Sequence, residues 1–196
     1  MPIANTRDSY GSVTKTLHWV TVLLIIVLFP LGLVAHSMAE NLRGPALGVT
    51  AEYLMRAIWL FSLHKTLGVT VFFVAVIRVV WGVLQPKPAP LSDNATQSQI
   101  ADIVHWLLYG ALLLVPLTGW IHHASTTGFA PIWWPFGQGL PLVPKSETLA
   151  AATAGLHIVF ERVLMISIIL HAAGALKHHF IDKDETLRRM LPGHTE

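Results

Sequence analysis

Two histidines in the last apolar stretch of the chain, His157 and His171, are fourteen residues apart. Fourteen residues are close to four turns of an α-helix, so both imidazoles are expected on one helix face. At about 1.5 Å per residue they lie roughly 21 Å apart along the axis, within a membrane core of about 30 Å. Imidazole is a common ligand of iron and other transition metals. The spacing suits two stacked haem groups better than one metal site.

Three of the other histidines, His18, His64 and His105, also lie inside apolar segments of this chain, which has 11 histidines in all. Ionisable side chains at such depth are uncommon and mark functional sites. If the segments cross a membrane in alternating directions, His64 and His157 lie toward the outer leaflet and are predicted to share one iron. His18 and His105 then lie at the level of His171. These three histidines compete for the two axial positions of a second iron.

Arg78 follows His64 by the same fourteen residues, so it is expected to face inward at the level of His171. A buried guanidinium requires an anion, and a haem propionate is a suitable one because Arg can donate two parallel hydrogen bonds to a carboxylate. The alternative for Arg78 is a structural role with its charged group reaching toward the membrane surface.

The first and third apolar segments resemble each other weakly. Each begins with a His-Trp pair, contains a proline that can kink a helix, and has a glycine fourteen residues after its histidine. The matched residues are His18, Trp19, Pro30 and Gly32 in the first segment, and His105, Trp106, Pro116 and Gly119 in the third. The glycines leave room for a flat group, although ordinary helix packing also explains small residues there.

The composition is that of an integral membrane protein, because 53% of the 196 residues are hydrophobic and only 12% are charged. Four apolar runs are long enough to cross a bilayer as helices. They cover residues 17–35, 57–84, 103–121 and 150–176. We predict an all-α fold, a transmembrane four-helix bundle that forms one domain over residues 1–196. The first run is expected to be a retained helix and not a removed signal peptide, because no small-residue cleavage pattern follows it.

Lysine and arginine are more frequent on the side of the bundle that carries the two termini, so both termini are predicted to be cytoplasmic. The chain has no cysteine, which excludes disulfides, iron–sulfur ligation and covalent haem attachment and leaves histidine and methionine as metal ligands. The formal net charge of +2 indicates no nucleic-acid partner.

Several residues outside the spans have simpler interpretations. The loop 124–147 is rich in aromatic residues and proline and is expected across the outer mouth of the bundle, with Trp133 and Trp134 as interfacial anchors. Lys145 could attract an anion there, but is more simply a loop residue. The other histidines are predicted to be solvated or at the surface: His36, His122 and His123 at the outer boundary, and His178, His179 and His194 in the charged tail.

Taken together, these residues resemble the prokaryotic cytochrome b-561 family of small four-helix di-haem membrane proteins. The resemblance covers nearly the whole chain. It rests on five stretches: LHW at 17–19, LHKTLG around His64 with Arg78 beyond it, HWLLY at 105–109 with Pro116, the pair His157 and His171, and HAAGALKHHFIDKDETLRRMLP at 171–192.

The resemblance implies two haem b groups, with His64 and His157 on the outer haem and His18 and His171 on the inner one. His105 is then a supporting polar residue. The spacing alone does not separate His18 from His105, because each begins an equivalent helix.

An iron with two imidazole ligands has no open position for substrate and gains or loses one electron. Electron transfer to or from the quinone pool is therefore the expected function, and the resemblance makes a superoxide:ubiquinone oxidoreductase of the bacterial inner membrane the leading reaction. One alternative is a cytochrome b anchor subunit that relays electrons between a dehydrogenase or hydrogenase and quinone. Another is a haem-free proton or metal transporter that uses the buried histidines.

Overall fold

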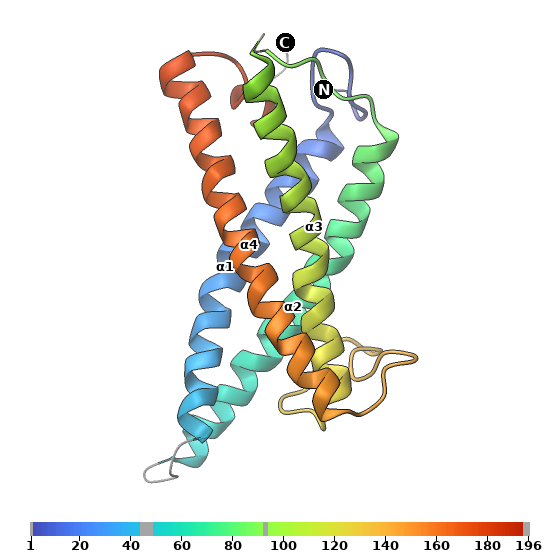
Figure 1. Ribbon diagram of the computed structural model, residues 1–196, viewed down its shortest axis with the longest axis vertical. Coiled ribbons are helices and arrows are strands. Elements are labelled where there is room, and N and C mark those ends of the chain that lie inside the picture. The colour runs from blue at the N-terminus through green and yellow to red at the C-terminus, as the bar shows by residue number, and fades with distance from the viewer. Residues whose placement is uncertain (1, 44–48, 92–93, 194–196) are drawn as a thin grey trace. The chain divides into compact units, whose positions relative to one another are not determined.

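The computed structural model describes residues 2–43, 49–91 and 94–193, and over these residues the chain is all-helical, with no strand. Four long helices dominate the fold (Figure 1). They are α1 (Ser12–Arg43), α2 (Ala51–Leu84), α3 (Ala95–Ser125) and α4 (Glu147–Lys177). All four are long and apolar enough to cross a membrane. The predicted all-α fold with four membrane spans is confirmed.

The helices are longer than the apolar runs that predicted them. The run at 17–35, for example, lies within a helix of 32 residues, which is about 48 Å long and exceeds the membrane core of about 30 Å. Hydropathy marks only the part of a helix that lies in lipid. The polar ends continue the helix into the interfacial region.

The most buried apolar residues of the helices are alanines, whereas many of the large apolar residues face outward. Ala35, Ala57 and Ala75 are at most 1% exposed, while Leu23 and Ile26 are more than 60% exposed. Membrane helices pack in this way because lipid is as apolar as leucine, so packing depends on close approach of helix backbones through small side chains. The outward-facing leucine and isoleucine side chains form the surface expected to contact lipid.

The chain folds into two compact units, and each helix contributes to both. Unit 1 comprises Met1–Thr21, Val74–Leu114 and Val159–Glu196. Unit 2 comprises Val22–Phe73 and Val115–Ile158. Both termini belong to unit 1. Each unit contains its own set of the histidines selected above.

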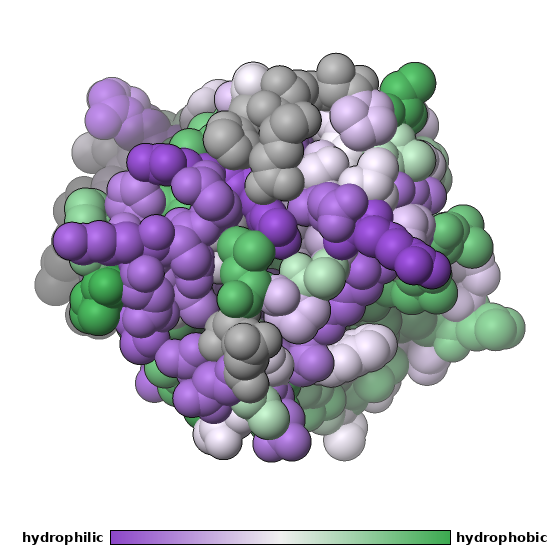
Figure 2. All heavy atoms as spheres, turned by 90° about the horizontal axis from the view of Figure 1, so that it is seen from above, coloured by the Kyte–Doolittle hydropathy of each residue, from purple (hydrophilic) through white to green (hydrophobic). Residues whose placement is uncertain are grey.

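The N-terminal segment of unit 1 is tied to the bundle by Asn5. The side-chain Oδ1 of Asn5 accepts hydrogen bonds from the backbone amide of Gly11 at 2.9 Å and from the Thr14 hydroxyl at 2.7 Å. The backbone amide of Asn5 donates to Gln85 Oε1 at 3.1 Å. Polar residues gather across this end of the molecule, as the end-on view in Figure 2 shows. The segment therefore has ordered contacts despite its polar composition.

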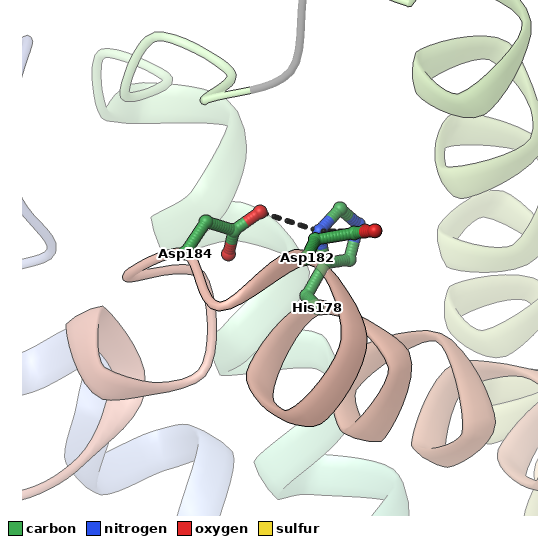
Figure 3. Close-up of side chains that lie close together, drawn as sticks. All are labelled: His178, Asp182 and Asp184. Atoms are coloured by element: carbon green, nitrogen blue, oxygen red, sulfur yellow. Dashed lines mark hydrogen bonds and ion pairs between the residues drawn. The ribbon is translucent and has the colours of Figure 1, made fainter.

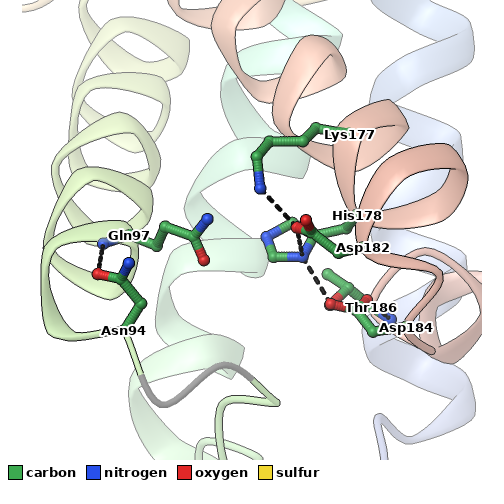
Figure 4. Close-up of polar contacts among 7 residues, drawn as sticks. All are labelled: Asn94, Gln97, Lys177, His178, Asp182, Asp184 and Thr186. Atoms are coloured by element: carbon green, nitrogen blue, oxygen red, sulfur yellow. Dashed lines mark hydrogen bonds and ion pairs between the residues drawn. The ribbon is translucent and has the colours of Figure 1, made fainter.

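The C-terminal segment begins with a π-helix, His178–Asp182, and turns back at Lys183, whose φ is 54°. The turn brings Asp184 to His178, where Asp184 Oδ2 lies 2.6 Å from His178 Nδ1 (Figure 3). Lys177 donates to Asp182 at 2.6 Å (Figure 4). Burial raises the pKa of Asp184, but its hydrogen bonds with Thr186 and His178 outweigh burial and hold the pKa below its usual value.

The rest of this segment also contacts the bundle. The Trp19 indole donates to the carbonyl of Met190 at 2.8 Å, and Arg189 donates to the carbonyl of Ala89 at 3.1 Å. The sequence predicted only that this tail is charged. In the structure it packs against the rest of unit 1 as far as Arg189 and Met190. His178 and His179 are half-buried, whereas His194 lies outside the described residues.

The long loop between α3 and α4 packs on α2 and α3 of unit 2. Thr66 of α2 accepts a hydrogen bond from the Trp133 amide at 3.0 Å, and its carbonyl accepts one from the Trp134 indole at 3.2 Å. The Trp120 indole of α3 donates to the carbonyl of Gly137 at 3.1 Å. The two loop tryptophans therefore fix the loop through hydrogen bonds.

Candidate functional site

In unit 2, His64 of α2 lies against Gly32 of α1. A Cβ atom built on Gly32 would lie only 2.8 Å from His64 Cε1, so a side chain there would displace the imidazole. The Nδ1 atom of His64 is buried and has no hydrogen-bond partner among the described residues. A buried polar atom without a partner is costly, and a bound group is one explanation for it. The fit of the ring into the space left by glycine agrees with a ligand role for His64.

His157 of α4 lies against Gly119 of α3 in the same unit and in the same manner. A Cβ atom on Gly119 would lie 3.0 Å from His157 Cε1 and Nδ1. His157 Nδ1 is 2.8 Å from the carbonyl of Val115. A carbonyl accepts, so Nδ1 carries the proton and Nε2 keeps its lone pair for a metal. The two glycines leave room for the imidazoles, whereas the sequence suggested only room for a flat group.

Unit 1 brings together the other four selected residues, one from each helix: His18 of α1, Arg78 of α2, His105 of α3 and His171 of α4. The ring centres of His18 and His171 are 6.2 Å apart, and those of His105 and His171 are 5.0 Å apart. All three histidines that compete for the second iron are therefore close enough to take part in one site.

The spacing of the rings favours His18 as the partner of His171. Two imidazoles that bind one first-row metal from opposite sides place their ring centres about 6.3 Å apart, because each metal–nitrogen bond is about 2.0–2.1 Å long, as for zinc. The distance of 6.2 Å between His18 and His171 is close to this value, whereas the 5.0 Å between His105 and His171 leaves too little room.

The positions of the protons on the imidazole nitrogens instead favour His105 as the partner of His171. Arg78 Nη2 lies 2.9 Å from His18 Nδ1, and because Arg only donates, this nitrogen accepts and the proton is on Nε2. His105 Nδ1 lies 2.6 Å from the carbonyl of Ala101 and must donate, so its Nε2 is free to bind a metal. For His18 to bind iron through Nε2, Arg78 has to release Nδ1 to another partner.

Arg78 also contacts Tyr109, a residue that the sequence reasoning did not select. The guanidinium carbon lies 5.6 Å from the centre of the Tyr109 ring. Tyr10 is close to Tyr109, and burial together with this neighbour raises the pKa of Tyr10, so its phenol stays protonated at neutral pH. Tyr109 thus lies beside the half-buried cation, and no carboxylate of the described residues is paired with Arg78.

A second group that sequence reasoning missed surrounds Lys65, the residue after His64. Its ammonium group donates to the carbonyls of Phe129 and Ala130 and lies 3.3 Å from His123 Nδ1. The lysine thereby holds the loop between α3 and α4 against α2. The signal was present in the sequence, because a lysine inside an apolar run is costly and needs a specific partner.

His123 is a correction to the sequence analysis. It was predicted to be solvated but is only 3% exposed. The loop covers it, and its ring nitrogens contact Lys65 and Gln138, both at 3.3 Å. Among the other boundary residues, His36 is exposed as predicted, and Lys145 donates to the carbonyls of Ala124 and Thr126. Those bonds give Lys145 a structural role at the end of α3.

Replacing Lys65 by methionine, which has a similar length and no charge, is expected to lower stability by about 1–3 kcal/mol, because two carbonyls, one of them that of the buried residue Ala130, lose their donor. The midpoint of thermal unfolding in detergent measures this. Lys87, exposed and 2.5 Å from Asp102, provides the control, since an exposed ion pair contributes about 0–1 kcal/mol. Equal midpoints for Lys65→Met and Lys87→Met would contradict an anchoring role for Lys65.

Comparison with known proteins agrees with these features. The sequence profile of the prokaryotic cytochrome b561 family matches residues 9–193. Cytochrome b561 homolog 2 of Escherichia coli (strain K12) is 31% identical over 97% of this chain and 95% of its own length. The probable superoxide oxidase CybB of Yersinia pestis is 27% identical over 95% of this chain and 97% of its own. With four membrane spans and half-buried histidines in both units, this chain belongs to the prokaryotic cytochrome b561 family of bacterial membrane proteins, which bind haem b and transfer electrons.

Proposed function

We propose that the chain binds two haem b groups, one through His64 and His157 in unit 2 and the other through His18 and His171 in unit 1. The observation that carries this proposal is that each unit holds its own pair of imidazoles, and that α4 supplies one ligand to each pair, fourteen residues apart. Iron with two imidazole ligands supplies one-electron transfer and no open coordination position.

The residues around these imidazoles have distinct tasks. Gly32 and Gly119 let the rings of His64 and His157 approach neighbouring helices. The carbonyl of Val115 keeps the proton of His157 on Nδ1. Hydrogen bonds of this kind orient a ligating histidine and select its tautomer. The sites are built into packed helices, which limits reorganisation when an electron arrives or leaves.

In unit 1, Arg78 is the cation available for a haem propionate. Its present partner, His18 Nδ1, is a neutral acceptor, and a carboxylate is a stronger one for a guanidinium. Transfer of Arg78 to the propionate would free His18 Nδ1 to carry the proton and Nε2 to bind iron. His105 would then stay bonded to Ala101 as a supporting polar residue.

Replacing Arg78 by glutamine is expected to weaken haem binding in unit 1 by about 10- to 100-fold, because one hydrogen bond to a charged group contributes about 1.5–3 kcal/mol. The haem-to-protein ratio after dialysis against a haem acceptor measures this. Arg56→Gln, at an exposed arginine 2.5 Å from Glu52, is the control and should retain haem. Full retention of haem in Arg78→Gln would contradict the proposal that Arg78 binds a haem propionate.

For the reaction, we propose superoxide as donor and ubiquinone as acceptor, in the inner membrane. Two superoxide anions would each lose one electron to become O₂, and one ubiquinone would take two electrons and two protons to become ubiquinol. Support comes from the relative named a probable superoxide oxidase, and from the location of both histidine pairs within helices long enough to span a bilayer, where a lipid-soluble quinone is present.

The test has two steps. First, purified protein should contain two haem b per chain by the pyridine haemochrome method. Second, a pulse of superoxide should reduce the haem within milliseconds and form ubiquinol in stoichiometric amount when ubiquinone is supplied. If the protein contains two haems but does not react with superoxide, superoxide is not the electron donor, while the proposed histidine ligands of the haems stand. Absence of haem from the purified chain would refute both.

A further inference from the structure

Trp19, the residue after His18, connects the start of α1 with the far end of the chain. Its indole donates a hydrogen bond to the carbonyl of Met190 at 2.8 Å, across 171 residues of sequence. Its ring also lies against the His18 ring, with ring centres 5.3 Å apart and ring planes at 88°. Perpendicular aromatic rings at this distance attract each other. The C-terminal segment therefore holds Trp19, which in turn contacts His18.

The acceptor of this hydrogen bond, the Met190 carbonyl, is itself held in place. Residues Arg188–Met190 form a short 3-10 helix. Arg189 of this helix donates to the carbonyl of Ala89, in the link between α2 and α3, at 3.1 Å. All of these residues belong to unit 1. The indole of Trp19 thus bonds to a fixed acceptor, and the bond limits the rotation of its ring.

Among the described residues, His18 has no hydrogen-bond acceptor that would fix its ring once it binds iron. A ligating histidine usually donates its second N–H to a carbonyl or a carboxylate, which orients the ring. His157 has such an acceptor in the carbonyl of Val115. The one hydrogen-bond partner of His18 among the described residues is Arg78, which is a donor. If Arg78 moves to a haem propionate, Trp19 is the contact that still orients the His18 ring.

Trp106 follows His105 in α3, just as Trp19 follows His18 in α1, but it has neither contact. It is 71% exposed, whereas Trp19 is half-buried. Over the described part of the chain, its indole forms no hydrogen bond and its ring lies against no other ring. Of the two His-Trp pairs, the first alone is linked to the C-terminal segment in this way.

We propose that Trp19 is a positioning residue for the haem of unit 1, through which the C-terminal segment sets the orientation of the His18 ring. This inference rests on the proposed ligation by His18. In the structure, the ring planes of His18 and His171 are 59° apart. The contacts that orient axial ligands tune both the affinity for the metal and its electronic state. A change near residue 190 would thus alter an iron that is bound near the start of the chain.

Trp19→Phe tests this proposal, because phenylalanine keeps an aromatic ring beside His18 and removes the indole N–H. Trp106→Phe is the matched control. Haem loss from each full-length protein to excess apomyoglobin should be followed, and the phase that His171→Ala lacks is assigned to unit 1. That phase should be about tenfold faster in Trp19→Phe, because loss of a group that orients a ligand lowers metal affinity about 10- to 100-fold. It should be unchanged in Trp106→Phe.

The electron paramagnetic resonance spectrum of the oxidised protein supplies a readout that a merely structural role would not move. The low-spin ferric signal depends on the angle between the two imidazole planes. In Trp19→Phe the signal of the unit 1 haem should shift, while that of the unit 2 haem should stay. Trp106→Phe should leave both signals as they are in the wild type.

Arg189→Ala changes the hold on the C-terminal segment and leaves Trp19 in place. Because it removes the hydrogen bond to Ala89, it should shift the same haem signal in the same direction as Trp19→Phe. Arg188→Ala, at an exposed arginine of the same 3-10 helix that pairs with Glu185 at 3.0 Å, is the control and should shift neither signal.

Release of the C-terminal segment can be measured without haem. The chain has no cysteine, so Met190→Cys supplies a single thiol at a half-buried position and keeps the carbonyl that accepts the bond. Adding Trp19→Phe should make this thiol react with a maleimide roughly fivefold faster, the effect of one lost hydrogen bond. Haem signals and haem loss identical to those of the wild type would overturn the proposal, even with a faster thiol. Absence of haem from the wild-type chain would refute the ligation and the proposal with it.

Discussion

Replacing His64 or His157 by alanine is expected to remove one haem b per chain and to leave the second in place. The iron of that site would keep a single imidazole, and the glycine beside each ring has no side chain that could replace the lost one. The pyridine haemochrome assay should fall from two haems to one. His36→Ala, at an exposed histidine of the same unit, should retain both. Two haems in either variant would exclude that histidine as a ligand.

The same measurement decides between His18 and His105. Ring spacing supports His18 with His171, and the tautomer supports His105, so the two alanine variants should differ sharply. We expect His18→Ala to lose one haem and His105→Ala to keep two. The opposite result would mean that Arg78 stays on His18 and that His105 moves to accommodate the iron.

Valine at Gly32 or Gly119 is expected to have nearly the effect of deleting the ligand itself. The added Cβ would lie 2.8 Å from the His64 ring or 3.0 Å from the His157 ring, and valine adds two further carbons. A free imidazole can turn aside, but a ring bound to iron is fixed, so the clash acts against the haem-bound state. The haem count should fall from two toward one.

Gly110→Val provides the control for this prediction. Gly110 lies in the same helix as Gly119, and apart from the adjacent residues and the helix's own backbone no heavy atom of the described residues lies within 4 Å of a Cβ built there. Both substitutions change helix propensity in the same way, so a difference between them isolates the steric effect. If Gly110→Val lost as much haem as Gly119→Val, helix stability and not ring contact would explain the loss.

The fold could be predicted from the sequence because lipid imposes a simple rule. Runs such as 57–84 are too long and apolar for anything except a spanning helix, and every backbone group within them must be bonded internally. The helical repeat then places residues at matched depths, which selected His18, His64, His105, His157 and His171.

The depth of a residue in the membrane does not determine the direction in which its side chain points around the helix. Nor does it determine the course of the loops. His123 was assigned to solvent because it lies near a helix end, but the loop folds back and buries it beneath Lys65 and Gln138. The contact between Arg78 and Tyr109 depends in the same way on side-chain rotamers.

The two glycine–histidine contacts of unit 2 repeat one arrangement in successive helix pairs. A glycine of α1 receives the histidine of α2, and a glycine of α3 receives the histidine of α4. Weak internal repeats of this kind are found in membrane proteins built from duplicated elements. An ancestral two-helix hairpin, copied once and fused in tandem, would produce this pattern and the shared His-Trp start of the first and third helices.

Such an origin would explain why unit 1 brings three histidines together, one more than the proposed iron would bind. Each copy would bring its own histidine at the start of its first helix, giving His18 and His105, while His171 fills the second axial position. Duplication would leave one of these two histidines without the ligand role of its ancestor. That position is then released from selection for ligation and can evolve a new role, so the spare histidine is the place where descendants of the ancestral hairpin are expected to differ most.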